Sequence, residues 1–323
     1  MTQDTRNVNG DSTGTAYDVV VVGGGAAGLS AGLVLGRSRR RVLVVDAGEP
    51  RNAPAAHMQG YLSRDGMPPA EFLAEGRREL AAYDVEVAED RVTAVLPDGA
   101  GEFEVTLAGG RSVHARRIVV ATGLVDELPD LPGVAERWGR DVLHCPYCHG
   151  WEVRDQPFGV IASEVTGIHQ ALLVTQWSKD VTLFLHTVRE LSDEDWEQLA
   201  AAGVTVVEGE VAGLEIEDDR LIGVRLAGGQ VFPRSALFVD AKPLPRHGLL
   251  NELGAAMQDT PVGPYPAVDP TGRTSVPGVW AVGNATGPKV QVIHAAAAGY
   301  QAGAMINYEL VMADINSRTA MEL

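Results

Sequence analysis

The sequence predicts an α/β protein, and three observations support this fold class. A run of β-branched residues from Tyr17 leads into a glycine-rich turn and then into a stretch of small residues, which is the pattern of a strand, a tight turn and a helix. A second apolar strand, residues 41–45, follows and ends in Asp46. The chain has 323 residues, 45% of them hydrophobic, which is enough to bury the cores of two domains.

The glycine-rich turn has the G-x-G-x-x-G spacing of a dinucleotide-binding site. In this pattern the first glycine permits the turn, the second lets the backbone approach a pyrophosphate, and the third packs the helix against the strand. The helix amino terminus then faces the phosphates, and Asp46 stands where a ribose-binding carboxylate is expected. This order of elements favours a bound dinucleotide over a glycine turn without a ligand. The predicted phosphate-binding residues are Gly23, Gly25, Ala26, Ala27 and Gly28.

Two later segments have the pattern of parts of the same site. Ala121, Thr122 and Gly123 end a buried strand with a small-residue turn that can pass close to a cofactor. Gly283 and Asn284 follow another strand and precede an alanine-rich helix that we expect to begin near residue 290. A helix start at this place would offer backbone amides to an electron-rich ring.

Both cysteines of the chain, Cys145 and Cys148, enclose a Pro-Tyr pair, and His149 follows directly. This spacing lets two sulfurs bond within one turn and lowers the thiolate pKa, so the pair predicts a redox-active disulfide. A static local disulfide and half of a zinc site are the alternatives. Zinc needs four ligands, and His144 and His149 lie too close in sequence to complete a tetrahedron.

Composition argues against several classes of partner. The 26 basic and 43 acidic residues give a net charge of −17, which repels nucleic acids and anionic membrane surfaces. No apolar run approaches the ~20 residues of a membrane span. Residues 1–16 have no secretory pattern and are expected to form a disordered tail. We therefore expect a cytoplasmic protein, in which a disulfide is more often catalytic than structural.

The order of these motifs over nearly the whole chain resembles the low-molecular-weight thioredoxin reductase family of flavoproteins. The resemblance implies bound FAD, a homodimer, and two Rossmann-like, three-layer dinucleotide-binding domains. It also implies that the FAD domain is discontinuous, with residues 1–123 and 242–323. An inserted domain, residues 124–241, would hold the redox cysteines.

The second nucleotide site of that family is missing from the sequence. The reductases bind NADPH through a glycine fingerprint in the inserted domain, but Ala162, Ser163 and Glu164 stand at that place here. A Cβ prevents close backbone approach, and the carboxylate of Glu164 would repel a pyrophosphate. The next strand ends at His186 without the paired arginines that hold a 2′-phosphate, for which Arg189 is a poor substitute. A different alignment of this loop is the alternative.

Two glycine pairs, at 109–110 and 228–229, do not supply this site. Each lies between short strand-like runs and predicts a hairpin turn. Electrons are therefore not expected to enter from a nicotinamide. We expect the thiol pair to take them from a substrate dithiol and to pass them through the flavin to dioxygen.

The lost site and the Cys-Pro-Tyr-Cys-His-Gly segment resemble the gliotoxin and holomycin dithiol oxidases of this family. These enzymes use FAD to close a disulfide within a small natural product and release hydrogen peroxide. The resemblance implies that Cys145 meets the substrate sulfur and that Cys148 lies beside the flavin C4a. It also implies that Asn284 accepts a bond from the flavin ribityl chain and that Gln291 and Val292 offer backbone amides to the flavin pyrimidine.

His149 stands where the reductases of this family have an aspartate. An imidazole with a pKa of ~6.5 takes a proton from a thiol near neutral pH more readily than a carboxylate with a pKa of ~4. His149 is therefore the predicted base, with packing in the turn as its alternative. His144 is the second candidate, equally suited to packing and to catalysis.

Three functions remain open at this point. The first is an FAD-dependent dithiol oxidase acting on a small-molecule dithiol and dioxygen. The second is a disulfide reductase fed by NADPH or another reduced donor, and the third is a flavin redox sensor without turnover.

Overall fold

The computed structural model describes residues 16–99, 101–163 and 166–321. The expected disordered tail therefore lies outside the described residues, apart from Ala16, and so do Glu164 and Val165. The chain divides into two compact units, which we describe separately. The first comprises residues 1–48, 76–123 and 246–323, and the second comprises residues 49–75 and 124–245.

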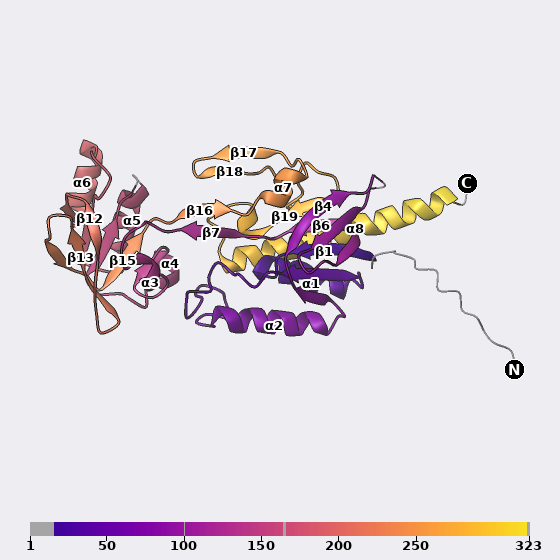
Figure 1. Cartoon of the computed structure of the whole chain (residues 1–323), viewed down its shortest axis with the longest axis horizontal. Coiled ribbons are helices and arrows are strands. Elements are labelled where there is room, and N and C mark those ends of the chain that lie inside the picture. Colours follow the sequence, from indigo (N-terminus) through magenta and orange to yellow (C-terminus); the bar gives the residue numbers. More distant parts are fainter. Residues whose placement is uncertain (1–15, 100, 164–165, 322–323) are drawn as a thin grey trace. The chain divides into compact units, whose positions relative to one another are not determined.

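The first unit is built on a seven-stranded sheet (Figure 1). Its main path runs in the order β3-β2-β1-β6-β5-β4, and β19 pairs with β6 beside it. The pairs among β3, β2, β1, β6 and β19 are parallel, whereas β4, β5 and the start of β6 form an antiparallel meander. The strands are β1 (Ala16–Val22), β2 (Val42–Asp46), β3 (Glu86–Glu89), β4 (Val92–Pro97), β5 (Phe103–Leu107), β6 (Ser112–Val120) and β19 (Val279–Ala281).

The register of the parallel strands brings the predicted motifs to one edge of this sheet. Val22, at the end of β1, pairs with Val45 of β2 and with Val120 of β6, and Val120 also pairs with Ala281 of β19. Parallel strands end at the same edge, so the segments that follow all four strands lie together. Each of these segments contains one of the predicted motifs.

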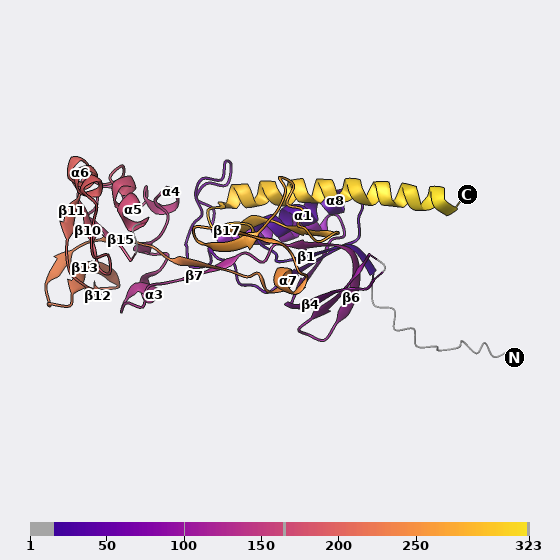
Figure 2. The same cartoon turned by 90° about the horizontal axis from the view of Figure 1, so that it is seen from above.

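Helices cover one face of this sheet. The small residues of α1 (Ala26–Arg37) allow α8 (Val292–Met321) to pack closely against it (Figure 2). A Cβ on Gly299 of α8 would lie 1.9 Å from the backbone oxygen of Ala27. The other elements are α2 (Pro69–Ala81), which spans the division between the units, α7 (Gly248–Glu252), β17 (Met257–Thr260), β18 (Gly263–Pro266) and the 3-10 turn η1 (Gly283–Ala285).

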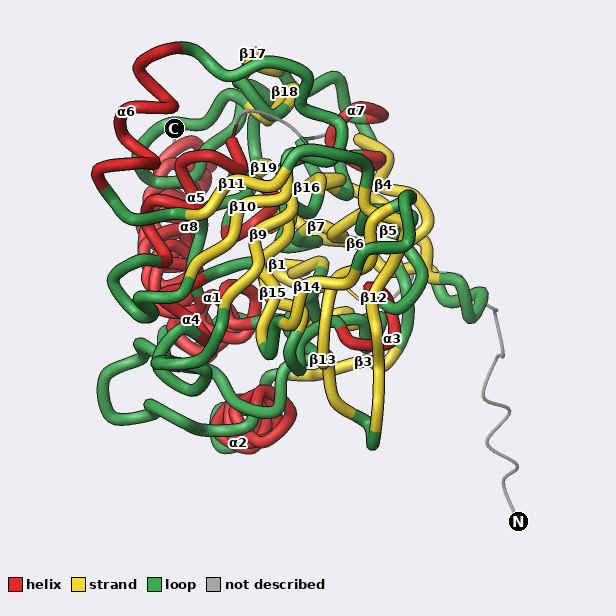
Figure 3. Tube along the Cα trace, turned by 90° about the vertical axis from the view of Figure 1, so that its left-hand side faces the viewer, coloured by secondary structure: helices red, strands yellow, loops and turns green. Residues whose placement is uncertain are grey.

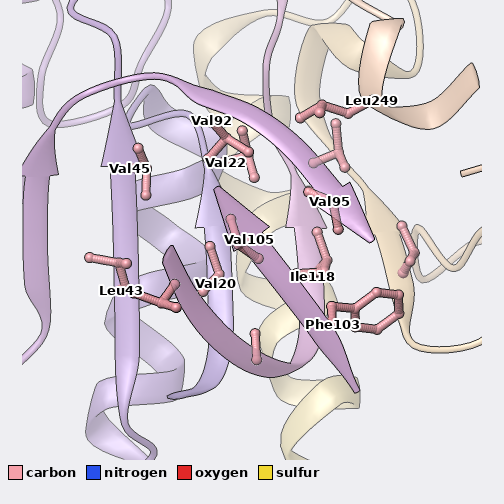
Figure 4. Close-up of a cluster of buried hydrophobic side chains, with 14 of the residues drawn as sticks. Val20, Val22, Leu43, Val45, Val92, Val95, Phe103, Val105, Ile118 and Leu249 are labelled. Carbon is pink, nitrogen blue, oxygen red and sulfur yellow. The ribbon is translucent and has the colours of Figure 1, made fainter. Parts of the chain in front are cut away.

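The opposite face of the sheet packs under the β4-β5 meander and α7 (Figure 4). Side chains on a strand alternate between faces, and the β-branched runs of β1 and β2 are apolar on both. The first unit therefore has a helical layer, a central sheet and a meander layer. The shared core includes Val20, Val22, Leu43, Val45, Val95, Phe103, Val105, Ile118 and Leu249.

The second unit contains a five-stranded parallel sheet in the order β11-β10-β9-β15-β8 (Figure 3). Helices α5 and α6 pack on one face of it, and the antiparallel sheet β12-β13-β14 packs on the other. The strands of the parallel sheet are β8 (Val142–Leu143), β9 (Phe158–Ile161), β10 (Val181–Phe184), β11 (Thr205–Val207) and β15 (Ala236–Val239). The remaining elements are β7 (Leu124–Glu127), α3 (Val134–Arg137), α4 (Pro146–His149), α5 (Thr166–Val174), α6 (Asp193–Ala201), β12 (Val211–Glu217), β13 (Arg220–Leu226), β14 (Val231–Pro233) and β16 (Lys242–Pro245).

Two local predictions are confirmed by the strand pairing. The glycine pair at 109–110 turns between the antiparallel strands β5 and β6, and the pair at 228–229 turns between β13 and β14. The predicted α/β fold class with two Rossmann-like, three-layer parts is confirmed as well.

Candidate active site

The thiol pair lies at the end of the short strand β8, where the chain turns into α4. Cys145 has an extended conformation and precedes Pro146, whose fixed φ suits the first position of a helix. The amides of Cys148 and His149 both donate to the backbone oxygen of Cys145, at 3.1 and 3.2 Å. This turn brings Sγ of Cys148 to 2.7 Å from Sγ of Cys145, and both side chains are half-buried. The pair can therefore exchange between dithiol and disulfide without rearranging the backbone.

The surroundings of Cys145 favour its thiolate form. The hydrogen bond from Cys148 is the largest effect, and together with the Cys148 amide and the nearby His144 it lowers the pKa of Cys145 from 9.0 to about 6. Burial opposes this change. A thiolate at neutral pH is the form that takes part in disulfide exchange.

His144 is held in one orientation by its neighbours. Its ring Nδ1 lies 3.2 Å from the backbone oxygen of Val239, at the end of β15. A carbonyl oxygen only accepts, so Nδ1 is the protonated nitrogen and Nε2 of the neutral ring is left as the acceptor. The backbone oxygen of His144 accepts a second bond, 2.5 Å long, from Nε2 of Gln170 on α5. These contacts fix both the tautomer and the position of the residue.

His149 has a different environment. Neither of its ring nitrogens makes a hydrogen bond within the described part of the chain, and both are shielded from solvent. Burial lowers the pKa of His149, and the Glu152 carboxylate and the Cys145 carbonyl oppose the change. The ring is therefore neutral at pH 7, and no hydrogen bond of good geometry in the described chain fixes its tautomer.

The predicted phosphate turn has the space that a pyrophosphate needs. A Cβ on Gly25 would have nothing within 4 Å, whereas a Cβ on Gly28 would lie 1.8 Å from the backbone oxygen of Gly23. Gly23 has φ +110 and lies against Ala121, because a Cβ on it would be 2.3 Å from the oxygen of that residue. One glycine thus leaves the backbone open and the other two allow tight packing, as the sequence pattern requires.

Asp46 lies beside this turn, as the parallel strands predict. Its carboxylate accepts bonds from the amides of Gly24, at 3.2 Å, and Gly48, at 3.4 Å, and it forms an ion pair with Arg77. Sequence reasoning did not single out Arg77, which lies on α2 and has no local motif. The ion pair fixes the carboxylate at the edge where a ribose would bind.

The remaining predicted cofactor residues lie at the same edge. Thr122 donates from its hydroxyl to the backbone oxygen of Arg246, at 3.0 Å, and Gly123 has φ +68. A Cβ on Gly283 would lie 3.0 Å from the Cβ of Ala27, so the 3-10 turn contacts the phosphate helix. The structure thus brings the phosphate turn, Asp46 and both later segments together.

Asn284 is oriented by three backbone carbonyls. Its Nδ2 donates to the oxygens of Gly287, Pro288 and Val290, at 3.0, 3.3 and 3.2 Å. The amide oxygen is therefore the group left to accept a bond from a ligand hydroxyl. Gln291 directly precedes α8 and Val292 begins it, so both lie at the amino-terminal end of this helix. These residues fit the ribityl chain and ring of a flavin.

In the described residues, the edge of the second parallel sheet has no such cradle. Ala162 and Ser163 follow β9 where glycines would be needed, and Glu164 lies outside the described residues. The hydroxyl of Thr166, at the first turn of α5, bonds the carboxylate of Asp240. Asp240 was missed from the sequence, although an acidic residue after a buried apolar strand is the signal that identified Asp46. Its carboxylate lies at the first turn of α5, the helix that follows β9.

Residues 17–302 match the family described as pyridine nucleotide-disulphide oxidoreductase. The chain belongs to this family. It is 31% identical over 321 residues to thioredoxin reductase sirT of Leptosphaeria maculans, covering 94% of this chain and 98% of that protein. It is 32% identical over 324 residues to thioredoxin reductase tcpT of Claviceps purpurea, covering 96% and 99%.

Solved structures agree with this assignment. The crystal structure of HlmI has 50% sequence identity and a TM-score of 0.91 and covers 98% of both chains. Thioredoxin reductase TrxB of Bacillus anthracis has 31% identity and a TM-score of 0.86, covering 92% of this chain and 99% of that one. The predicted resemblance to the thioredoxin reductases is confirmed, and the protein is an FAD-binding oxidoreductase.

Two features are absent from the described residues. No helix within them is long and apolar enough to cross a membrane. Within the same residues, no group of three or more His, Cys, Asp or Glu side chains is arranged to hold a metal ion.

Proposed function

We propose that this oxidoreductase is a dithiol oxidase that closes a disulfide within a small-molecule dithiol and passes the electrons to dioxygen. The observation that carries the proposal is the contact of Asp240 with Thr166 at the first turn of α5. It sets a carboxylate at the place where the phosphates of a nicotinamide nucleotide would need amide donors. Electrons must then come from the substrate of the thiol pair.

The proposed cycle begins with the disulfide form of Cys145 and Cys148. A substrate thiolate attacks Sγ of Cys145, and Cys148 leaves as a thiolate. The second substrate thiolate attacks the substrate sulfur of this mixed disulfide, and Cys145 leaves as a thiolate. One S–S bond has formed in the substrate and one has broken in the protein, so two electrons have moved to the cysteine pair. When bound, FAD supplies two-electron acceptance and delivery to dioxygen, which with two protons gives hydrogen peroxide.

The proton from the substrate thiol needs a base near Cys145. The structure favours His144, because the Val239 carbonyl holds the proton on Nδ1 and leaves Nε2 to accept. His149 stays the base expected from the sequence, with a neutral ring but no orienting partner in the described chain. Both histidines directly adjoin the thiol pair in sequence. A substitution of each one shows which of them acts as the base.

The proposal is tested by offering two electron sources to the FAD-loaded protein without oxygen. Dithiothreitol should bleach the yellow flavin, and readmitted oxygen should restore it with one hydrogen peroxide per dithiol. NADPH should leave the flavin yellow. The variant Cys145→Ser should stop bleaching by dithiol, whereas Ser235→Ala, at an exposed serine of the same unit, serves as the matched control. Rapid bleaching by NADPH would instead support a disulfide reductase, and no bleaching by either would support a sensor.

We also propose that the protein is a homodimer, as the resemblance to the thioredoxin reductases implies. Support comes from α8, on which Tyr300, Tyr308 and Ile315 recur at seven- or eight-residue spacing and are 61%, 60% and 48% exposed. Such spacing places them on one side of a helix. Light scattering should give twice the chain mass of 34.2 kDa, and Tyr308→Glu should shift it toward the single chain.

A further inference from the structure

Two aromatic side chains beside the thiol pair are open to solvent. Tyr147, between the cysteines, is 70% exposed, and Trp151, just after α4, is 65% exposed. In the described part of the chain they are the two most exposed tyrosine or tryptophan residues. Large apolar rings are usually at least half-covered in a folded protein, so two exposed ones together require an explanation.

The backbone places the two rings one helical turn apart. The amide of Gly150 donates to the oxygen of Pro146, and Gly150 keeps helical dihedral angles with φ −61 and ψ −32. Side chains four residues apart on a helical turn lie on the same side of it. Tyr147 and Trp151 therefore flank the segment that contains Cys148 and His149.

Each ring is supported from behind by a neighbour. Trp177 meets Tyr147 edge to face, with ring centroids 5.6 Å apart and planes at 89°. Trp177 also packs against Gly150, where a Cβ would lie 2.9 Å from its ring. The guanidinium of Arg154 stacks on Trp151, 3.9 Å from the ring centre. The rings are thus fixed in place while their outer surfaces stay exposed, which is how a preformed binding surface is built.

The charges of this segment limit what the surface can bind. Glu152 and Asp155 are exposed on the same loop, and the one guanidinium between them is already stacked on Trp151. The whole chain has a net charge of −17. A polyanionic substrate is therefore disfavoured, and flat uncharged rings are the groups that aromatic side chains contact best.

We propose that Tyr147 and Trp151 contact the substrate and select uncharged dithiols that contain a flat aromatic ring. This inference rests on the proposed function, because Tyr147 lies between the two cysteines in the chain and Trp151 follows α4, so both are close in sequence to the sulfur that a substrate would attack. The rings contribute binding of the substrate body and take no part in the exchange of sulfur bonds. The substrate class is thereby narrowed from any small dithiol to planar aromatic ones.

The test compares two dithiols that both close a six-membered cyclic disulfide, ortho-xylylenedithiol with a benzene ring and dithiothreitol without one. The rate of anaerobic flavin bleaching gives kcat/KM for each with the FAD-loaded full chain. Wild type should prefer the aromatic dithiol. In Tyr147→Ala and in Trp151→Ala the ratio of the two kcat/KM values should fall about tenfold, through a higher KM, since one aromatic contact contributes a factor of that order.

Two further variants separate ring contact from general damage. Tyr147→Phe keeps the ring and should keep the preference. Trp196→Ala removes an exposed tryptophan from the separate helix α6, where the side chain is 41% exposed, and should change neither rate. Equal losses for both dithiols, or a wild type that does not discriminate, would overturn the proposal. The proposal would also be overturned if the ring variants lost rate only with reduced thioredoxin as the substrate, because the rings would then contact a protein partner.

A binding measurement distinguishes this proposal from the proposed function. Calorimetric titration with the cyclic disulfide of ortho-xylylenedithiol needs no turnover and no electron acceptor. If the disulfide binds wild type more tightly than the ring variants, but dithiols do not bleach the flavin, the aromatic binding surface is supported and the oxidase function is refuted. If both dithiols bleach the flavin, but the cyclic disulfide binds wild type and Trp151→Ala equally, the oxidase function is supported and the aromatic binding surface is refuted.

Discussion

The hydroxyl of Thr166 donates a hydrogen bond to the carboxylate of Asp240, 74 residues away along the chain. Thr166 begins α5, and Asp240 follows β15, the strand next to β9 in the parallel sheet. In dinucleotide-binding folds the helix after such a strand directs its free amides toward phosphate. A fixed carboxylate at that point makes the site unfavourable for the same ligand, whatever the rest of the sheet retains.

The first prediction concerns NADPH. If the missing glycine cradle and the Asp240 charge each cost about 1.4 kcal/mol, the nucleotide binds about 100-fold more weakly than at an intact site. Asp240→Asn should raise the affinity for NADPH about tenfold, as measured by quenching of protein fluorescence with NADPH. Asp259→Asn, which removes an equal charge from β17, should recover nothing. Tight NADPH binding by the unmodified protein would refute the argument.

The second prediction concerns the reactivity of Cys145. Its pKa is lowered to about 6, so the thiolate form persists above that pH and is lost as the pH falls through it. The pH midpoint of Cys145 alkylation by iodoacetamide, read by mass spectrometry on the reduced protein, should therefore differ between the intact pair and Cys148→Ala, which has no side-chain donor. Because the Cys148 hydrogen bond is the largest cause, its removal should move the Cys145 midpoint upward, toward 9.0. An unchanged midpoint would contradict the assigned cause.

The third prediction separates the two histidines. His144→Asn should lower the rate of flavin bleaching by a dithiol about 100-fold at pH 7, as expected for loss of a general base. The loss should shrink at high pH, where the substrate is already a thiolate. If His149 only packs in the turn, His149→Asn should change the rate much less and show no such recovery. The reverse pattern would assign the base to His149.

The fourth prediction concerns the glycines of the phosphate turn. Gly25→Ala adds a methyl group into open space, so the protein should fold but lose FAD affinity because the backbone is no longer accessible to the pyrophosphate. Gly28→Ala forces a Cβ against the Gly23 oxygen and should lower the melting temperature of the FAD-free protein as well. Differential scanning fluorimetry and flavin absorbance measure the two effects. Equal destabilisation of the FAD-free forms would be inconsistent with these geometries.

The fifth prediction concerns Asn284. Aspartate at this position would set a carboxylate against the three carbonyl oxygens that now accept from Nδ2, so Asn284→Asp should cost about 1–3 kcal/mol of stability at neutral pH. The cost should diminish in acid, where the carboxyl group is protonated and donates one bond. Asn284→Ala serves as the uncharged control in urea denaturation. A more stable Asn284→Asp protein would show that the turn rearranges.

Much of the fold was predictable because its signals are local. The strand, glycine turn and helix from Tyr17 to Gly28 each follow from the spacing of apolar and small residues within a short window. The parallel strands then required Asp46, Ala121 and Gly283 to lie at one edge. Such arguments need only the order of the elements along the chain.

The contacts that refine the site were not predictable in this way. The bond between Gln170 and the His144 oxygen, and the support of the His144 ring by Val239, join residues 26 and 95 positions apart. They depend on which strands neighbour each other in the second sheet, and the sequence pattern does not determine that order. For the same reason the sequence favoured His149 as the base, since its position beside Cys148 is visible and the support of His144 is not.

Val239 ends β15 and Asp240 follows it, and each residue contacts a different partner. The carbonyl of one orients an imidazole, and the carboxylate of the other accepts a bond from Thr166 at the first turn of α5. Replacing the acidic residue to admit a nicotinamide, if it excludes one as proposed, changes the residue whose backbone nitrogen is bonded to the carbonyl that holds the histidine proton. Variants at position 240 should therefore be assayed for dithiol oxidation as well as for nucleotide binding.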